Sequence, residues 1–365
     1  MRLLLVVALL LSTRVSALLP LKTPGTAKVV GSVAVLSAVG SWWERRDDLY
    51  TPAPGSLSDK TVLITGGTTG LGLESAKRLA YGGAQVIVTS RSIRKGEDAI
   101  SQIADFLKKK GISNEKISFR VLDLDDLASV KAATEWNDLP ELDVLLNNAG
   151  IMAPPDLKLT IDGVERQMQS NHLGHFVLTA TLAKKLKKDA RIINVSSTAH
   201  TIPGPKGLDF DYMWKGSTGY GAWKSYGQSK LANIHFTLEL QRRARAAGLD
   251  WECATLHPGV VATDLGRYII GEDNFMKQKS SDGKGPLEKF VQSAVNLFLK
   301  TPEQGATTQI WLASGEGHDI GGKYFVDCDA KPLAGYATDA MVSERLWNES
   351  EGLSGISFDL SAPLP

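Results

Sequence analysis

The sequence predicts an α/β fold in which one doubly wound domain carries a seven-stranded parallel sheet with helices on both faces. From residue 60, short β-branched runs alternate with longer helical patterns, which is typical of parallel βαβ units. Most of these runs are apolar without alternation, as expected for strands that helices cover on both faces. A glycine-rich turn directly follows the first run.

The seven strands are identified by valine, isoleucine, threonine and aromatic residues, which favour extended backbone. They are expected at TVLIT (61–65), QVIVT (85–89), ISFRVL (117–122), DVLLN (143–147), RIINVS (191–196), WECATL (251–256) and KYFVD (323–327).

Composition excludes several classes of protein. The 365 residues are 43% hydrophobic and 22% charged with a net charge of +1, so the chain resembles a globular protein and carries no nucleic-acid footprint. The two cysteines, Cys253 and Cys328, form no CxxC pair. We therefore expect neither a disulfide framework nor a bound metal.

The first residues have the pattern of a secretory signal peptide, which we assign to 1–17. Arg2 is followed by the apolar run LLLVVALLL and by VSA at 15–17, a cleavage pattern that places the cut after Ala17.

Residues 18–57 allow two interpretations. The run VVGSVAVLSAVGSWW (29–43) is short for a spanning helix, but tryptophans and arginines at its end suit a membrane interface, so it is either an anchor or a transit-type segment. A signal followed by such a segment resembles the bipartite presequences of algal plastids. The expected location is the endoplasmic reticulum membrane or a plastid reached through it. A linker at 51–56, the main domain at 58–350 and a tail at 351–365 follow.

A phosphate-binding loop is predicted at TGGTTGLG (65–72), between the first strand and a helix. Backbone N–H groups and the helix dipole meet a pyrophosphate at such a turn, as in Rossmann-type domains. Gly66 permits the tight turn, Gly70 allows the backbone to approach the phosphates, and Gly72 allows close helix packing. The spacing differs from the G-x-G-x-x-G of many dehydrogenases.

The residues after the second strand favour NADP(H) over NAD(H). A carboxylate is expected there for the ribose 2′-hydroxyl of NAD, but the chain has Ser90 and Arg91. A guanidinium binds a 2′-phosphate through charge-assisted hydrogen bonds.

Several motifs together resemble the short-chain dehydrogenase/reductase family over about residues 58–350. They are TGGTTGLG, NNAG (147–150), NVSS (194–197), YGQSK (226–230) and HPGVVATDL (257–265). The resemblance implies a catalytic tetrad of Asn171, Ser197, Tyr226 and Lys230. It also implies cofactor contacts from Thr65, Gly66, Thr68, Gly70, Leu71, Gly72, Arg91, Asp123, Leu124, Asn148, Ala149, Gly150, Tyr226, Lys230, Pro258, Gly259 and Thr263.

The chemistry explains the tetrad. Reducing a carbonyl by hydride requires a proton for the oxygen, and the reverse reaction removes one. Lys230, with the positively charged nicotinamide, is expected to lower the pKa of Tyr226, the general acid/base. Ser197 would hold the reacting oxygen, Lys230 the nicotinamide ribose, and Asn171 a water that connects Lys230 to solvent.

More particular stretches resemble one branch of the family, which contains retinol dehydrogenases, WW-domain oxidoreductases and a chloroplast translocon component. They are NHLGHF (171–176), YGQSKLAN and GGKYFVDC. The branch implies an NADP(H)-dependent oxidoreductase, often membrane-associated, for a small lipophilic alcohol or carbonyl compound. Residues 266–290 would form a substrate lid, but the mixed composition of this segment does not indicate a particular substrate.

Two alternative functions stay open. One alternative is light-dependent protochlorophyllide reduction, although neither cysteine falls in the expected active-site region. Another is a non-catalytic NADP-sensing subunit of a membrane complex, against which the complete tetrad argues. His172 and His175 are expected to be packing residues, and the oligomeric state is not predicted.

Overall fold

The computed structural model describes residues 49–113, 116–216, 219–259, 261, 300–315, 319–358 and 360. Residues from Tyr50 onward form one compact unit, which is the subject below. The expected signal peptide and the run at 29–43 lie outside the described residues, as do Thr263 and the expected lid. In the part that is described, no helix is both long enough and apolar enough to cross a membrane.

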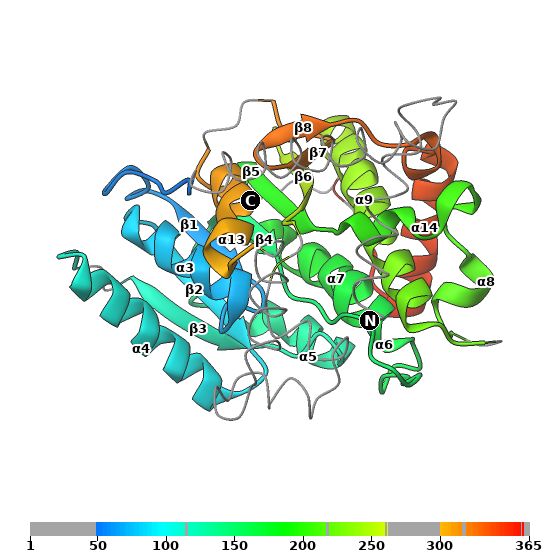
Figure 1. The fold of residues 1–365 in the computed structure, drawn as a ribbon, viewed down its shortest axis with the longest axis horizontal. Helices are drawn as coiled ribbons and strands as arrows, with labels where there is room; N and C mark the ends of the chain where they lie inside the picture. Colours follow the sequence, from blue (N-terminus) through cyan, green and yellow to red (C-terminus); the bar gives the residue numbers. More distant parts are fainter. Residues whose placement is uncertain are drawn as a thin grey trace, which may run out of the picture. The chain divides into compact units, whose positions relative to one another are not determined.

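One eight-stranded sheet forms the centre of the unit, in the order β3-β2-β1-β4-β5-β6-β7-β8 (Figure 1). The strands are β1 (Thr61–Ile64), β2 (Gln85–Ser90), β3 (Ile117–Val121), β4 (Leu142–Asn147), β5 (Leu186–Val195), β6 (Glu252–His257), β7 (Lys323–Val326) and β8 (Asp329–Lys331). β1 to β7 are parallel, which confirms the predicted seven-stranded parallel sheet.

β8 was not predicted, and it pairs antiparallel with β7. Asp327 and Cys328 join the two strands with φ of 52° and 59°, the left-handed conformation that tight hairpin turns require. Such turns usually contain glycine or asparagine, and all three residues of β8 are exposed. A short polar strand after an unusual turn sequence leaves little signal in the sequence.

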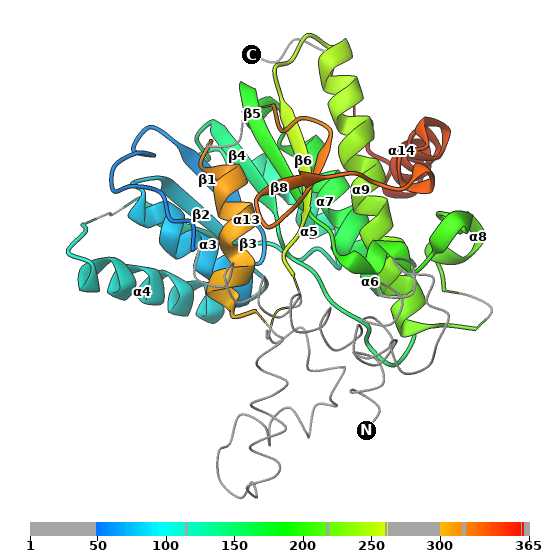
Figure 2. The same ribbon diagram turned by 45° about the horizontal axis from the view of Figure 1, so that its top comes forward.

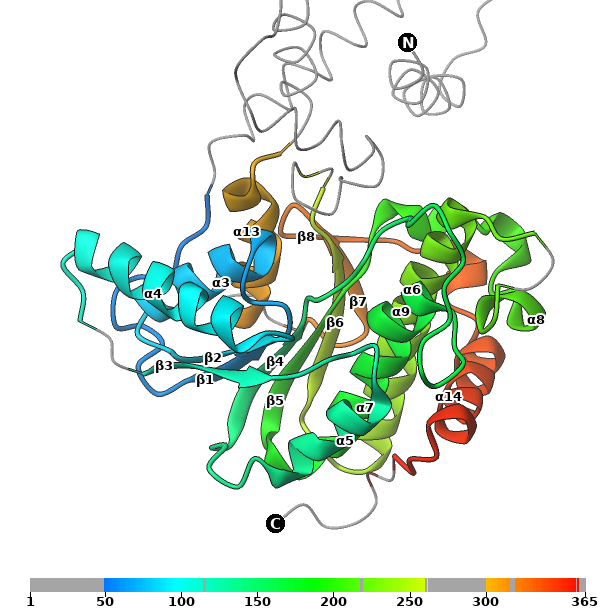
Figure 3. The same cartoon turned by 90° about the horizontal axis from the view of Figure 1, so that it is seen from below.

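Helices cover both faces of the sheet, as Figure 3 shows. One face carries α3 (Gly70–Tyr81), α4 (Ile93–Lys109) and α13 (Pro302–Ala313); the other carries α5 (Leu127–Lys131), α7 (Gly174–Thr181) and α9 (Ala222–Ala246). Successive strand residues alternate between the two cores: Val62 and Ile64 belong to one, and Leu63 to the other. Two buried faces explain why the strands are continuously apolar.

The unit extends beyond the expected range of 58–350 at both ends. The carbonyl of Tyr50 accepts a 2.7 Å hydrogen bond from buried Arg78 of α3. The last helix, α14 (Ala340–Ser354), packs against α9 (Figure 2). Beyond it, buried Phe358 stacks on Trp347 with a centroid distance of 4.8 Å. These residues therefore contribute to the hydrophobic core.

The strand order reverses between β1 and β4, and this reversal positions the site. The chain continues from β1 to β2 on one side, whereas β4 leads to β5 on the other. In open α/β sheets, ligands bind at the carboxyl ends of the strands at such a switch point. The predicted loop at 65–72 and the NNAG motif follow β1 and β4 at this edge.

Candidate active site

Ser197, Tyr226 and Lys230 come together at the carboxyl end of β5. Ser197 follows that strand and begins a short 3-10 helix, η4 (Thr198–Thr201), while Tyr226 and Lys230 lie on α9. α9 packs along β5 and β6, so its first turns reach the end of the strand. Tyr226 and Lys230 are 7% and 4% exposed.

Hydrogen bonds hold these side chains in place. The Lys230 ammonium donates to the carbonyl of Val195 at 3.1 Å, and the Ser196 hydroxyl donates to the Lys230 carbonyl at 2.7 Å. Lys230 Nζ lies 5.7 Å from the centroid of the Tyr226 ring. The Ser197 hydroxyl acts on the Tyr226 hydroxyl and favours its ionised form. Three members of the expected tetrad thus form one cluster, in which Tyr226 and Lys230 are buried and Ser197 is partly exposed.

Burial decides the protonation of this cluster. Burial raises the pKa of Tyr226 to about 12, and the influence of the Ser197 hydroxyl only partly opposes that shift. Burial also lowers the pKa of Lys230 to about 8. In the protein itself, loss of hydration penalises the phenolate; the lowering expected from the sequence includes the charge of the nicotinamide and stays a prediction for the complex. Tyr226 is therefore a protonated phenol at neutral pH and can donate a proton.

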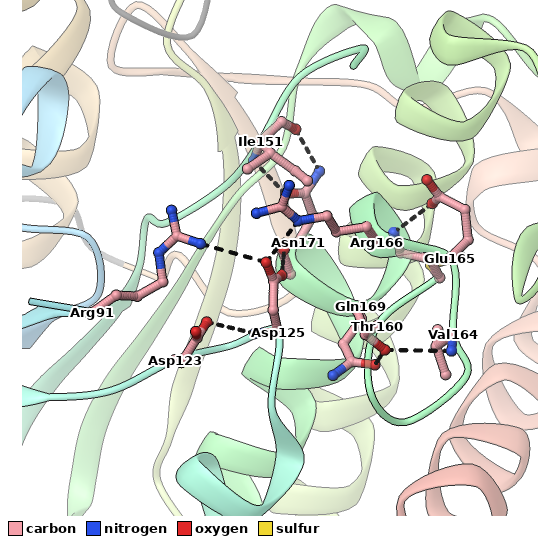
Figure 4. Close-up of polar contacts among 12 residues, drawn as sticks. Arg91, Asp123, Asp125, Ile151, Thr160, Val164, Glu165, Arg166, Gln169 and Asn171 are labelled. Atoms are coloured by element: carbon pink, nitrogen blue, oxygen red, sulfur yellow. Dashed lines mark hydrogen bonds and ion pairs between the residues drawn. The ribbon is translucent and has the colours of Figure 1, made fainter. Parts of the chain in front are cut away.

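Asn171, the fourth expected member, lies in a π-helical turn, η2 (Gln169–Leu173), just before α7. Its side-chain Oδ1 accepts the Ile151 N–H at 2.8 Å, and its Nδ2 donates to the Ile151 carbonyl at 3.0 Å (Figure 4). Nδ2 also donates to the Ser229 hydroxyl at 2.9 Å. Asn171 therefore connects the loop after β4 to α9.

Ser229 was missed by the sequence analysis, although it lies inside the YGQSK motif. Its hydroxyl accepts from Asn171 and donates to the Tyr226 carbonyl at 2.8 Å. A serine between the tyrosine and the lysine gives no signal of this role, because its partner is 58 residues away in the chain. Gly150 lies beside the same group: a Cβ there would be 3.0 Å from Asn171 Oδ1 and 3.3 Å from Lys230 Nζ.

The glycine-rich turn has the geometry of a phosphate cradle. Gly66 and Gly70 have φ of 63° and 54°, which glycine adopts without strain. A Cβ on Gly72 would be 2.4 Å from the Gly66 carbonyl oxygen, so a side chain has no room there. Thr69 provides no side-chain cap to α3, whose first turn contains no acidic residue. An uncapped helix N-terminus behind a glycine turn fits the pyrophosphate of a dinucleotide.

Thr65, Asn148 and Ala149 form the frame of this cradle. The Thr65 hydroxyl accepts the main-chain N–H of Asn148 at 2.9 Å and of Ala149 at 3.0 Å. Asn148 Nδ2 in turn donates to the Thr65 carbonyl at 2.8 Å. Gln309 of α13, which the sequence analysis missed, donates to Asn148 Oδ1 at 3.2 Å.

The side chains expected at the adenosine end have different environments. Arg91 is 53% exposed and lies 3.5 Å from Asp125, whose carboxylate accepts a 2.7 Å bond from Arg166 (Figure 4). Asp123 Oδ1 accepts the Asp125 N–H at 3.0 Å and so stabilises the turn after β3. Leu124 is buried in the core against Gly174. Of these, Arg91 is the most exposed.

The remaining predicted residues flank the cradle or follow β6. Thr68 is partly exposed, whereas Leu71 is buried and its side chain faces Gly305 of α13. Pro258 and Gly259 directly follow β6, and Gly259 has φ of 90°. They therefore lie at the carboxyl edge of the sheet, and their contact with a cofactor stays a prediction.

The two predicted packing histidines are both buried. His172 Nε2 lies 3.0 Å from the Ser350 hydroxyl of α14, and its ring is 6.1 Å from that of Trp214. His175 instead contacts Thr65 and the Asn171 main chain.

The chain is similar to a protein family, to several named proteins and to a solved structure. The family model described as "short chain dehydrogenase" matches residues 60–209. "Retinol dehydrogenase 11" of Homo sapiens is 37% identical over 83% of this chain and 88% of its own length. "Short-chain dehydrogenase TIC 32 A, chloroplastic" of Brassica napus is 35% identical over 80% and 87%. A solved structure of an uncharacterized Mycobacterium Paratuberculosis protein has a TM-score of 0.62 and 33% identity, covering 86% of this chain and 97% of its own.

We predict that Lys230→Met stabilises the fold at pH 7. Because the pKa of Lys230 is lowered, folding disfavours the ammonium; this cost is fully present below about pH 8 and fades as pH rises towards 10.5. Val195 keeps a second donor, Asn233 Nδ2 at 3.1 Å. The free energy of unfolding should rise by about 2 kcal/mol at pH 7 and much less at pH 10, measured by denaturant titration.

The control is Lys224→Met, which removes a half-exposed lysine from the same helix. It should change stability by less than about 0.5 kcal/mol at either pH. A lower stability of Lys230→Met than of wild type at pH 7 would contradict the account of the buried ammonium.

Proposed function

The chain belongs to the short-chain dehydrogenase/reductase family, and from that membership we propose that it is an NADP(H)-dependent oxidoreductase that interconverts an alcohol and a carbonyl on a small lipophilic substrate. The observation that carries the proposal is the cluster of partly exposed Ser197 with buried Tyr226 and Lys230 beside the glycine cradle. Members of this family bind nicotinamide cofactors.

In the proposed reaction, each residue of the site has a separate chemical role. A bound nicotinamide cofactor supplies or accepts the hydride. The protonated Tyr226 phenol donates its proton to the carbonyl oxygen during reduction, and the phenolate removes the alcohol proton in the reverse direction. The Ser197 hydroxyl holds the same oxygen. The Lys230 ammonium stabilises the phenolate that forms.

The cofactor would be held by the N-terminus of α3, by Arg91 and by Lys230. Lys230 would bond the nicotinamide ribose, and Asn171 would position water near Lys230. Asp123, Leu124, Pro258, Gly259 and Thr263 are proposed contacts to the adenine and nicotinamide ends.

NADP(H) is preferred over NAD(H) because of the residues after β2. Arg91 is exposed, and its one described ion pair, to Asp125, is long at 3.5 Å, so most of its N–H donors can serve a phosphate. No carboxylate directly follows β2 that would repel a 2′-phosphate, since residues 90–92 are Ser, Arg and Ser.

A lipophilic substrate is supported by the apolar side chains near Tyr226. The Trp223 ring lies edge-on to Tyr226 with a centroid distance of 6.0 Å and is partly exposed. Ile202 is also exposed and approaches Gly227 of α9. The similarity to retinol dehydrogenases points to a retinoid-like or aldehyde substrate.

The N-terminal segments are proposed to direct the chain into the secretory pathway, with residues 18–57 either anchoring it in the endoplasmic reticulum membrane or carrying it to a plastid. The chloroplastic relative keeps the second destination open. A fluorescent fusion of residues 1–57 should label either the endoplasmic reticulum or a plastid. Uniform cytosolic fluorescence would contradict the proposal.

We predict that the full-length protein oxidises NADPH with a member of a panel of retinal and straight-chain aldehydes, and that Tyr226→Phe lowers kcat at least about 100-fold. The phenylalanine keeps the packing but removes the proton donor. The affinity for NADPH, measured by fluorescence titration, should stay within about threefold.

The matched control is Tyr212→Phe, since Tyr212 is also buried but its hydroxyl contacts Ser225. This variant should keep the activity. Full activity in Tyr226→Phe would contradict the mechanism. NADPH binding without turnover of any panel compound would favour the non-catalytic, nucleotide-sensing alternative.

Arg91→Asp should weaken NADPH binding by about 10- to 100-fold and favour NADH, because a carboxylate repels the 2′-phosphate and accepts from the ribose hydroxyl. Dissociation constants for both cofactors measure the change. Lys109→Asp, the same charge reversal at the far end of α4, should leave them unchanged. Equal affinity of the wild type for NADH and NADPH would refute the role of Arg91.

A further inference from the structure

His175 connects the phosphate cradle to the π-helical turn η2, which carries Asn171. It lies on α7 and is 2% exposed. Its Nε2 is 2.8 Å from the Thr65 hydroxyl at the end of β1, and its Nδ1 is 3.0 Å from the main-chain carbonyl of Asn171. One imidazole therefore bridges two segments that are far apart in the chain.

The partners of the ring fix which atom donates. The Asn171 carbonyl can only accept, so Nδ1 carries the proton. Burial lowers the pKa of His175 to about 4, which leaves the ring neutral at pH 7. Nε2 must then accept, and the Thr65 hydroxyl must donate to it.

This assignment completes the hydrogen bonding of Thr65. With its proton directed to His175, the Thr65 oxygen accepts the two N–H groups of Asn148 and Ala149. The other possible acceptor for that proton, the Leu146 carbonyl, is farther away at 3.4 Å. The orientation that suits His175 is thus the one that holds β1 to the end of β4.

The second bond, from His175 Nδ1 to the Asn171 carbonyl, holds the turn from which the Asn171 side chain extends. The ring holds the main chain of Asn171, whose side chain reaches Ile151 and Ser229. Lys230 is close enough for its charge to lower the pKa of His175. The histidine thus lies between the cradle and the catalytic cluster.

We propose that His175 is a positioning residue that couples the cofactor cradle to the catalytic cluster: its Nε2 orients the Thr65 hydroxyl and its Nδ1–H holds the Asn171 main chain. The inference rests on the proposed function of the site. It adds a positioning role to the packing role expected for His175.

His172 provides a matched comparison three residues earlier. It is equally buried, but its Nε2 contacts Ser350, and its ring packs against Phe176, Trp214 and Phe236. Loss of this imidazole removes a buried hydrogen bond and ring contacts without touching the cradle.

Two substitutions of His175 separate the two bonds. Asn places an amide N–H near the position of Nδ1, and Gln places an amide oxygen near that of Nε2. In the full-length protein, His175→Asn should raise the dissociation constant for NADPH about 10-fold with kcat nearly unchanged. His175→Gln should lower kcat with retinal about 10-fold while the dissociation constant stays close to that of wild type.

His172→Asn and His172→Gln serve as controls, with thermal unfolding measured for all four variants. The proposal fails if the His175 and His172 variants change NADPH affinity and kcat equally at an equal loss of stability. A wild-type protein that binds no NADPH would instead refute the proposed function.

A direct measurement on the wild type does not depend on the folding of any variant. Nitrogen-15 NMR of histidine-labelled protein should show one ring that is protonated at Nδ1 and not at Nε2, neutral from pH 7 to pH 5, and missing in the best-folded His175 variant. An Nε2–H tautomer, or a charged ring at pH 7, for His175 would overturn the proposal.

Discussion

The hydrogen bond from the Lys230 ammonium to the Val195 carbonyl is the interaction on which the site depends. It fixes the first turns of α9 against the carboxyl end of β5, and it places a positive charge in a nearly water-free environment. That charge is costly to bury, as the lowered pKa of Lys230 shows. The cost is typical of functional sites, where stability is given up for chemistry.

Around this bond, polar side chains serve mainly as a frame. The side-chain oxygens of Thr65 and Asn171 accept main-chain N–H groups of the segment after β4, and the N-terminus of α3 has no side-chain cap. In a low-dielectric interior such networks are rigid when every group is satisfied. A rigid frame is what proton transfer between fixed atoms requires.

The sequence predicted the parallel strands and the cradle from local patterns, whereas the tetrad residues were assigned through the resemblance to the family. β-Branched runs report burial on two faces, and the cradle needs glycines at fixed spacing. The hairpin at Asp327 and Cys328 lacked such a signal, and the burial of Phe358 depends on Trp347. The contacts of Ser229 and His175 involve residues far away in the chain, so neighbouring residues do not reveal them. The direction of the Tyr226 pKa shift depends on burial, which the local sequence does not show either.

The most direct test of the account is a crystal structure of the full-length protein with NADP⁺ bound. The account predicts the pyrophosphate at the N-terminus of α3, the 2′-phosphate within hydrogen-bonding distance of Arg91, and the nicotinamide ribose within reach of Lys230 Nζ. A nicotinamide placed away from Tyr226, or a 2′-phosphate that Arg91 does not contact, would contradict it.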